Sequence, residues 1–156
     1  MVRGCRSAKG QTSMRGRKLA AIVAVAAAVL GCGPAEAAGT TSFDGNWNLT
    51  YICANTRTGG GRGFTWMMLA QIHGGSLIAQ RGQKGGLDSA TIIGKIDADG
   101  DGLLRFEGLT GASDYTIGKV APLTPYHYTA DVHFDATRGT GKRNEDRDCT
   151  LTFVKQ

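Results

Sequence analysis

Residues 64–72 read FTWMMLAQI, and this stretch decides the fold class. Taking every second residue places apolar side chains on one face, in the order Phe64, Trp66, Met68, Ala70 and Ile72. A period of two residues is typical of a β-strand, whereas a helix repeats every three to four residues. A glycine-rich segment at 55–63 precedes the run and Gly74-Gly75 follows it, so we expect turns on both sides of this strand.

Seven further runs of the same kind continue along the chain. They cover residues 47–53, 76–81, 89–96, 103–109, 115–120, 126–134 and 149–154. Short connections rich in glycine and aspartate separate them, which indicates tight turns. About eight evenly spaced strands without helical periodicity predict an all-β fold, and we favour an antiparallel up-and-down barrel. A β-sandwich is the alternative.

Two cysteines lie at matching places in this pattern. Cys53 ends the first run and Cys149 begins the last. In an eight-stranded up-and-down barrel the first and last strands are antiparallel neighbours, so these two ends coincide. They are also the only cysteines after residue 37, and an even count in an exported domain indicates a Cys53–Cys149 disulfide, with two free buried thiols as the alternative. In the barrel this bridge would lie at the closing seam. A sandwich could also bring the two ends together, so the cysteines favour the barrel without excluding the sandwich.

The chain begins with a segment typical of secretion signals. Residues 14–18 read MRGRK, and the apolar run LAAIVAVAAAVL at 19–30 is too short to span a bilayer. Because residues 14–18 already form a positively charged start, Met14 is preferred to Met1 as the first residue. We expect residues 1–37 to be an N-terminal extension and signal peptide. Residues 38–156 then form a single exported β-barrel domain with no transmembrane segment.

The end of the signal allows two kinds of processing. Ala35-Glu36-Ala37 fits the small-residue site of an ordinary signal peptidase, which would release a periplasmic or extracellular protein. Val29-Leu30-Gly31-Cys32 resembles a lipoprotein box, and cleavage there would leave a lipid anchor on Cys32 and a membrane-anchored lipoprotein. Leu30 is uncommon at its position in such a box, which favours the first alternative.

The formal net charge of +5 belongs to the leader. Six of the 18 basic residues and one of the 13 acidic residues precede Ala38, which leaves twelve of each sign in the rest of the chain. A surface that binds phosphate groups needs an excess of basic side chains. Nucleic acid is therefore not an expected partner.

An aromatic-rich interior follows from the strand pattern. The candidate interior residues are Trp47, Tyr51, Phe64, Trp66, Phe106, Tyr126, Tyr128 and Phe134. Two interpretations are open. These aromatic rings either fill the core of so short a chain, or they line a small apolar pocket in which phenolic hydroxyls orient a ligand. The pocket predicts a non-enzymatic barrel that binds a small apolar or aromatic molecule.

The filled core leads to a second hypothesis, in which the barrel is the scaffold of an interaction module of the cell envelope. Met67 and Leu69 point outward from the strand at 64–72 and form an apolar face. The glycine-rich segment at 55–63 offers a second surface for an envelope protein.

One segment resembles part of a calcium loop. Asp97, Asp99 and Asp101, with Gly102 at position 6, reproduce the first half of an EF-hand loop. Position 12, where a glutamate binds the ion in such loops, is Gly108. We therefore interpret the segment as a polar hairpin turn, with calcium as the alternative and no other cofactor expected.

Catalytic signatures are missing from the sequence. Neither a G-x-S-x-G elbow nor an H-E-x-x-H motif occurs, so we do not expect an enzyme. Asp131 and His133 share one face of the run at 126–134 and are the basis of a second alternative, a hydrolase. A solvated outer face explains the same pair, since His127 and Thr129 extend the polar row.

Two motifs resemble known proteins. Gly45-Asn46-Trp47 is similar to the G-x-W that begins lipocalin and avidin barrels, which implies that Trp47 packs across the floor of a barrel. Phe43-Asp44-Gly45-x-Trp47 together with Arg147-x-Cys149-x-Leu151-x-Phe153 resembles a group of small exported proteobacterial proteins of uncharacterised function. The second resemblance covers most of residues 38–156 and implies no activity.

Overall fold

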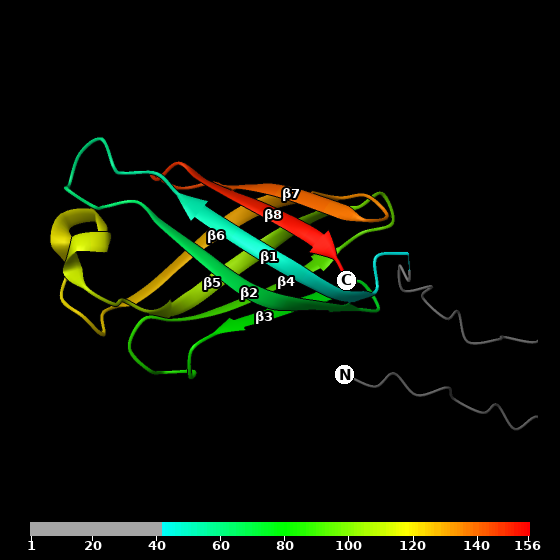
Figure 1. The fold of residues 1–156 in the computed structure, drawn as a ribbon, viewed down its shortest axis with the longest axis horizontal. Coiled ribbons are helices and arrows are strands. Elements are labelled where there is room, and N and C mark those ends of the chain that lie inside the picture. Colours follow the sequence, from blue (N-terminus) through cyan, green and yellow to red (C-terminus); the bar gives the residue numbers. More distant parts are fainter. Residues whose placement is uncertain (1–41) are drawn as a thin grey trace, which may run out of the picture. The chain divides into compact units, whose positions relative to one another are not determined.

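Each strand of the chain pairs with the next in antiparallel register, and the last returns to pair with the first. The computed structural model describes residues 42–156. The strands are β1 (Gly45–Cys53), β2 (Phe64–His73), β3 (Ser76–Arg81), β4 (Ser89–Ile96), β5 (Asp101–Leu109), β6 (Pro125–Phe134), β7 (Arg138–Arg143) and β8 (Cys149–Lys155). Figure 1 shows the closed eight-stranded barrel that results, which confirms the predicted fold class.

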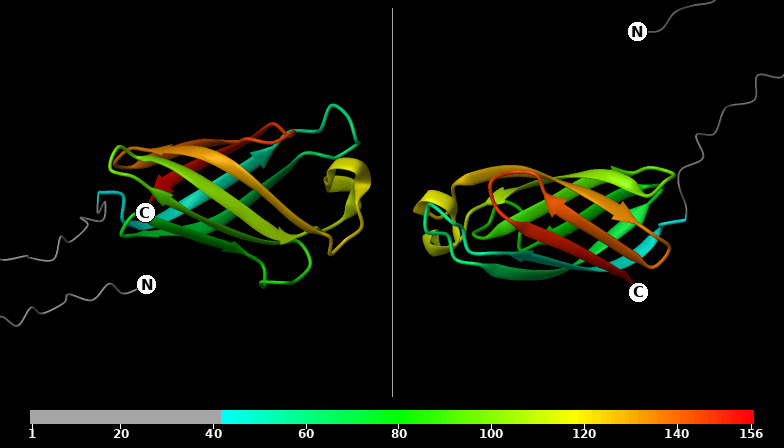
Figure 2. Two further views of the ribbon diagram at one scale, coloured as in Figure 1. Left: turned by 180° about the vertical axis from the view of Figure 1, so that it is seen from behind. Right: turned by 90° about the horizontal axis from the view of Figure 1, so that it is seen from above.

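The barrel has two ends that differ in their connections. We call the mouth the end that carries the segments 54–63, 82–88, 110–124 and 144–148. We call the floor the end that carries the short turns at 74–75, 97–100 and 135–137. Figure 1 shows the long loops together at the mouth, and Figure 2 shows the same separation from two further sides.

One predicted strand was wrong. Residues 115–120 lie in the connection between β5 and β6 and take part in two 3-10 turns, η1 (Ser113–Tyr115) and η2 (Ile117–Lys119). Gly118 and Lys119 have positive φ angles of 73° and 51°, which an extended strand does not allow. The backbone N–H groups of Thr116 and Lys119 also donate locally, to the carbonyls of Ser113 and Thr116.

The strand β7 was not predicted, and it completes the set of eight strands. Its inward positions are Gly139, Gly141 and Arg143, so it shows no apolar alternation. A Cβ atom on Gly139 would lie 2.6 Å from Cδ1 of Phe134, and one on Gly141 would lie 2.5 Å from Cγ1 of Val132. The large side chains of β6 therefore require glycine on β7, and this requirement removed the pattern that identifies a strand.

The seam between β1 and β8 has the predicted disulfide. The register pairs Trp47 with Lys155 at one end and Cys53 with Cys149 at the other. The two cysteines are directly opposite each other and bonded, at the mouth of the barrel. The expected position of the bridge at the closing seam is confirmed.

Aromatic packing fills the floor half of the interior. Trp47 is fully buried, and its indole Nε1–H donates to the carbonyl of Phe43 at 3.0 Å. The ring of Phe134 meets Trp47 edge to face at 5.1 Å between centroids and meets Phe153 at 4.8 Å. These contacts leave the floor solid, so any space inside the barrel has to lie toward the mouth.

The predictions about the leader concern residues outside the described part of the chain. They are the signal peptide and N-terminal extension at 1–37, the two processing sites and the lipid anchor on Cys32. Within residues 42–156, no helix is long and apolar enough to cross a membrane.

We predict that the seam disulfide is a major source of stability. Cys53 and Cys149 are 96 residues apart. On the chain-entropy model, a disulfide that closes a loop of that size stabilises the folded state by about 4 to 5 kcal/mol. The double variant Cys53→Ala/Cys149→Ala should therefore unfold at a much lower urea concentration than the oxidised protein. Reductant should lower the stability of the wild type and leave that of the double variant unchanged. Equal midpoints for the two oxidised proteins would contradict this prediction.

Candidate ligand-binding site

Burial along β2 changes from the floor to the mouth. Its inward residues Ala70 and Ile72 are buried, whereas Phe64, Trp66 and Met68 toward the mouth are only half-buried. A cavity of about 600 Å³ accounts for the difference, since Phe64 and Trp66 form part of its wall. Pockets for small molecules commonly have volumes in this range.

The structure divides the eight aromatic residues of the predicted interior into three groups. Four of them line the cavity: Phe64, Trp66, Tyr126 and Tyr128. Tyr51 and Phe106 are fully buried beneath these rings, while Trp47 and Phe134 belong to the packed floor. The strand alternation thus identified inward residues but did not indicate which half of the barrel each would occupy.

The base of the cavity is a continuous set of aromatic contacts. Phe106 stacks on Tyr128 with ring centroids 4.6 Å apart, and Tyr128 stacks on Tyr126 at 5.5 Å. Tyr51 lies 5.3 Å from Phe106 and 5.6 Å from Trp66, which links the two walls. A flat apolar molecule entering the cavity would meet ring faces on β2 and β6.

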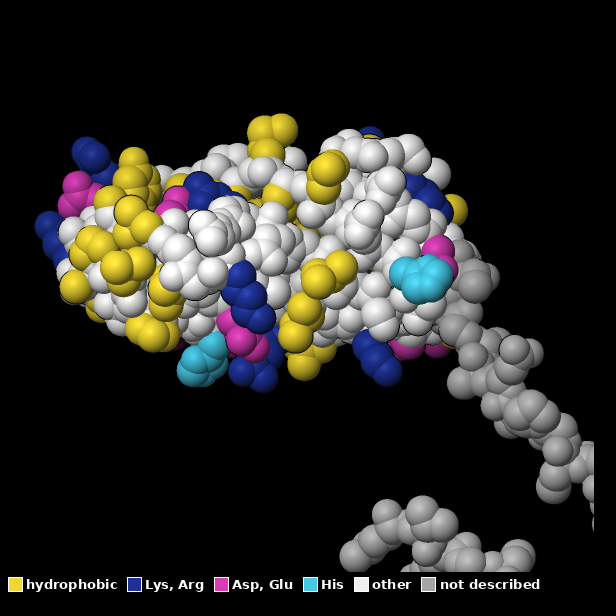
Figure 3. Space-filling model, turned by 90° about the horizontal axis from the view of Figure 1, so that it is seen from below, with side chains coloured by type: hydrophobic (Ala, Val, Ile, Leu, Met, Phe, Trp, Pro, Cys, Tyr) yellow, Lys and Arg dark blue, Asp and Glu magenta, His cyan; other side chains and the backbone are white. Residues whose placement is uncertain are grey.

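The connection at 110–124 covers one side of the mouth. Thr110 ties the start of this connection to its end, because its hydroxyl donates to Ala121 O at 2.7 Å and accepts from the N–H of Thr124 at 2.9 Å. Ile117 and Val120 line the cavity and are also partly exposed. Figure 3 shows apolar side chains gathered at this end of the barrel.

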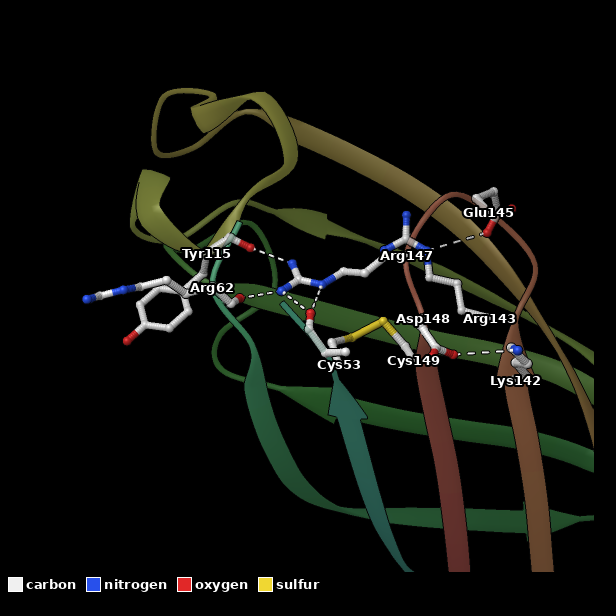
Figure 4. The surroundings of a disulfide bond; sticks show 10 residues. Cys53, Arg62, Tyr115, Lys142, Arg143, Glu145, Arg147, Asp148 and Cys149 are labelled. Carbon is white, nitrogen blue, oxygen red and sulfur yellow. Dashed lines mark hydrogen bonds and ion pairs between the residues drawn. A yellow bond between two sulfur atoms is a disulfide. The ribbon is translucent and has the colours of Figure 1, made fainter. Parts of the chain in front are cut away.

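Arg147 ties the loops of the mouth together (Figure 4). Its side chain is buried, and its guanidinium donates to the backbone carbonyls of Ala54, Tyr115 and Arg62. The three carbonyls belong to two loops that are far apart in sequence. Burial lowers the pKa of Arg147, but a guanidinium still remains protonated in proteins. The residue is therefore a positively charged strut with its donors in use.

A second arginine of the cavity wall is also engaged. Nη1 of Arg81 donates to the carbonyl of Asp88 at 2.6 Å and lies 2.7 Å from a carboxylate oxygen of the same residue. Its guanidinium covers the ring of Trp66 at 4.8 Å. Arg81 and Asp88 together close the side of the mouth next to β3.

The third arginine, Arg143, differs from the other two. Its guanidinium stacks on the ring of Tyr128 at 4.0 Å, and its Nε lies 3.7 Å from a carboxylate oxygen of Glu145. That separation is too long for a hydrogen bond. Nε is buried and has no hydrogen-bond partner among the described residues. Arg143 thus brings to the cavity wall a partly buried positive charge whose Nε is paired with Glu145 but not hydrogen-bonded.

Burial keeps neutral the tyrosine hydroxyls that line the cavity and the one beneath it. Burial raises the pKa of Tyr51, Tyr126 and Tyr128, and for Tyr51 the nearby Tyr128 and Arg143 partly offset that effect. The Tyr126 hydroxyl donates to Ser89 O at 2.9 Å. In contrast, the buried Tyr51 hydroxyl has no hydrogen-bond partner within residues 42–156.

The sequence did not identify the three arginines as site residues. Arg143 is separated by two residues from Gly141 and by four from Gly139, so its inward direction follows once β7 is recognised. Arg147 lies in a mixed-charge segment that resembles a solvated hairpin end. Only the three-dimensional arrangement of the loops shows that this residue is buried.

The candidate calcium residues lie at the floor, far along the strands from the cavity. Oδ1 of Asp97 accepts from the backbone N–H groups of Asp99 at 3.0 Å and Asp101 at 2.9 Å, which is the hydrogen bonding of a turn. Asp101 begins β5, and its carboxylate lies 2.7 Å from Nδ1 of His133. No group of three or more metal-binding side chains occurs within residues 42–156. Calcium binding stays the alternative to the predicted polar turn.

The polar pair of the hydrolase hypothesis lies on the outer wall. Asp131 and His133 are exposed on β6, and His133 pairs with Asp101 of the neighbouring strand. Met67 and Leu69 also point outward, as predicted, and these residues are 79% and 61% exposed. None of these four residues lines the cavity.

No protein-family model, curated protein or solved structure matches this chain. The chemistry of the site therefore follows from the geometry of the barrel itself.

We predict that Arg147 orders the mouth. The variant Arg147→Met leaves three carbonyls without their charged donor, at a cost of about 2 to 3 kcal/mol. Hydrogen exchange should become faster in residues 55–63 and 113–119, and the urea midpoint should fall. Arg57→Met, an exposed change in one of the same loops, is the control and should alter neither measurement. Unchanged exchange in both loops of Arg147→Met would refute the assignment.

We also predict a loss of stability at alkaline pH. Because the folded state raises the pKa of the three tyrosines, their stabilising effect is complete below pH of about 10 and disappears as the pH rises through the folded-state pKa. The free energy of unfolding should therefore fall above about pH 10. Tyr51→Phe removes one of these groups and should make the decline shallower in urea titrations from neutral to alkaline pH. A decline of unchanged slope would count against this account.

Proposed function

We propose that this protein is a binding protein for a small, largely apolar aromatic molecule held in the mouth cavity. The observation that carries the proposal is the contrast between the two halves of the barrel. Aromatic rings pack solidly at the floor, while those of β2 and β6 near the mouth surround a cavity of about 600 Å³. A protein that needed only a scaffold would gain stability by filling that space, because buried contact stabilises and cavities are costly.

The composition of the wall supports an aromatic ligand. Phe64, Trp66 and Tyr128 present ring surface, and Ile117 and Val120 add aliphatic contacts from the covering segment. Ring faces and edges favour other aromatic groups in stacked or edge-to-face contacts. Guanidinium groups on the wall also stack on aromatic planes, which suits a flat molecule between them.

We propose that this binding takes place outside the cytoplasm. The Cys53–Cys149 bridge supports export, because structural disulfides form and persist in oxidising compartments. The seam position makes the bridge part of the barrel rather than an exposed redox pair, since both cysteines are buried.

An envelope interaction module is the second candidate. The exposed Met67 and Leu69 on the outer wall favour it, because such side chains are common in protein interfaces. The hypothesis does not use the cavity, and the floor alone has the filled core that it assumes. We therefore place ligand binding first.

The neutral aromatic dye N-phenyl-1-naphthylamine is a suitable probe of the cavity. We predict that its fluorescence rises in the presence of the purified protein and saturates at one dye per chain. Trp66→Ala removes a ring from the wall and should weaken dye binding at least about tenfold, since a buried aromatic ring contributes on the order of 2 kcal/mol.

The neighbouring change Met67→Ala is the matched control, because this side chain points outward from the same strand. It should leave dye affinity unchanged. Absence of saturable binding by the wild type, or equal loss in both variants, would argue against a ligand site at the mouth.

A further inference from the structure

We propose that the ligand of the mouth cavity carries a carboxylate, which binds to the guanidinium of Arg143. This inference rests on the proposed function and defines its ligand more closely. It depends on which donors of the cavity are already used by the protein and which are not.

Two of the three arginines on the wall are held by short hydrogen bonds. Arg147 donates to three backbone carbonyls, and Arg81 is bound by both the carbonyl and the carboxylate of Asp88. Arg143 is held less closely, because its Nε forms an ion pair with Glu145 at 3.7 Å and this buried atom makes no hydrogen bond within the described residues. Buried polar groups without hydrogen bonds are rare because each is costly, so an incompletely paired cation at a cavity indicates room for a further acceptor.

The side chain of Arg143 is nevertheless held in place. The ring of Tyr128 supports one face of the guanidinium at 4.0 Å, and only 15% of the side chain is exposed. Glu145 lies beside Nε, but its carboxylate is already engaged. It accepts from the N–H of Thr129 at 2.8 and 3.0 Å and from the hydroxyl of the same residue at 2.9 Å. Arg143 is therefore oriented by its neighbours without being satisfied by them.

The Tyr51 hydroxyl lies behind this wall. It is buried, and Tyr51 is not among the residues that line the cavity. Its ring is 6.2 Å from that of Tyr128 and 6.0 Å from that of Phe64. Burial raises the pKa of Tyr51, so its phenol is neutral and adds no negative charge beside Arg143 that would repel a ligand carboxylate.

The charge of the wall fits a single carboxylate. Asp88 is the acidic residue of the lining, and it is paired with Arg81. That pairing leaves the charges of Arg143 and Arg147 uncompensated apart from Glu145 behind the wall. A planar guanidinium matches a planar carboxylate, and the bond is stronger than one between neutral groups. The aromatic walls then hold the rest of the molecule, so the ligand class is a small aromatic carboxylic acid.

The test compares 2-naphthoate with its neutral relative 2-naphthamide by isothermal titration calorimetry on the purified protein. The two probes share ring and shape and differ in charge. We expect the carboxylate to bind at least about tenfold more tightly to the wild type, as charge-assisted hydrogen bonds are about twice as strong as neutral ones. Arg143→Met should remove this preference and keep the affinity for the amide.

The matched control is Arg138→Met, which removes an exposed arginine from the floor end of the same strand and should keep the preference. Far-UV circular dichroism and melting temperature establish that each variant is folded.

The outcomes separate the two proposals. Equal or tighter binding of the amide by the wild type overturns the carboxylate assignment and leaves the aromatic cavity in place. A preference that persists in Arg143→Met also overturns it. Failure of both probes and of the neutral dye to bind overturns the proposed function itself.

Discussion

Closure of the sheet between β1 and β8 is the constraint on which the rest of the structure depends. Eight strands give an interior just wide enough to be filled by side chains, so each inward position competes for the same narrow space. At the floor, Trp47, Phe134 and Phe153 occupy that space. Phe134 and its neighbour Val132 fit because the facing strand has glycine at 139 and 141, where a Cβ atom would lie 2.6 Å from Phe134 and 2.5 Å from Val132. The cavity lies toward the mouth, beyond the part of the barrel in which large side chains face glycine on the next strand.

The mouth keeps its space because its long side chains are fixed against the wall. Arg81 lies over Trp66 and Arg143 over Tyr128, so each guanidinium covers a ring instead of crossing the interior. The hydroxyl of Tyr126 is directed to the backbone of β4 by its bond to Ser89. Stacking and hydrogen bonding along the wall thus leave the centre open. A core of unbranched apolar residues would have no such anchors and would collapse into the space.

The two-residue alternation identified the strands whose inward face is apolar. It failed for β7, whose inward face is not apolar, and for residues 115–120, which are not a strand. β2, β3, β4 and β6 alternate clearly, and the matching positions of Cys53 and Cys149 indicated the closing pair. β7 escaped because its inward residues are small or charged, a choice imposed by Phe134 and Val132 across the register. Residues 115–120 were predicted as a strand from their alternation, yet Gly118 and Lys119 adopt left-handed conformations there. The aromatic part of the site was accessible from sequence, whereas Arg81, Arg143 and Arg147 became site residues only through pairing and loop closure.

The distribution of cross-links follows from where the core is missing. The floor is held by close packing of Trp47 with its aromatic neighbours, so it needs no further support. The mouth surrounds a cavity and lacks that packing, and both the seam disulfide and the Arg147 strut are found there. The N–H of Arg62 bonded to Asp114 O and the N–H of Gly118 bonded to Gly59 O add further ties between its two long loops. A covalent bond and a buried cation therefore do at the mouth what hydrophobic contact does at the floor, and they do so without occupying the space that a ligand would need.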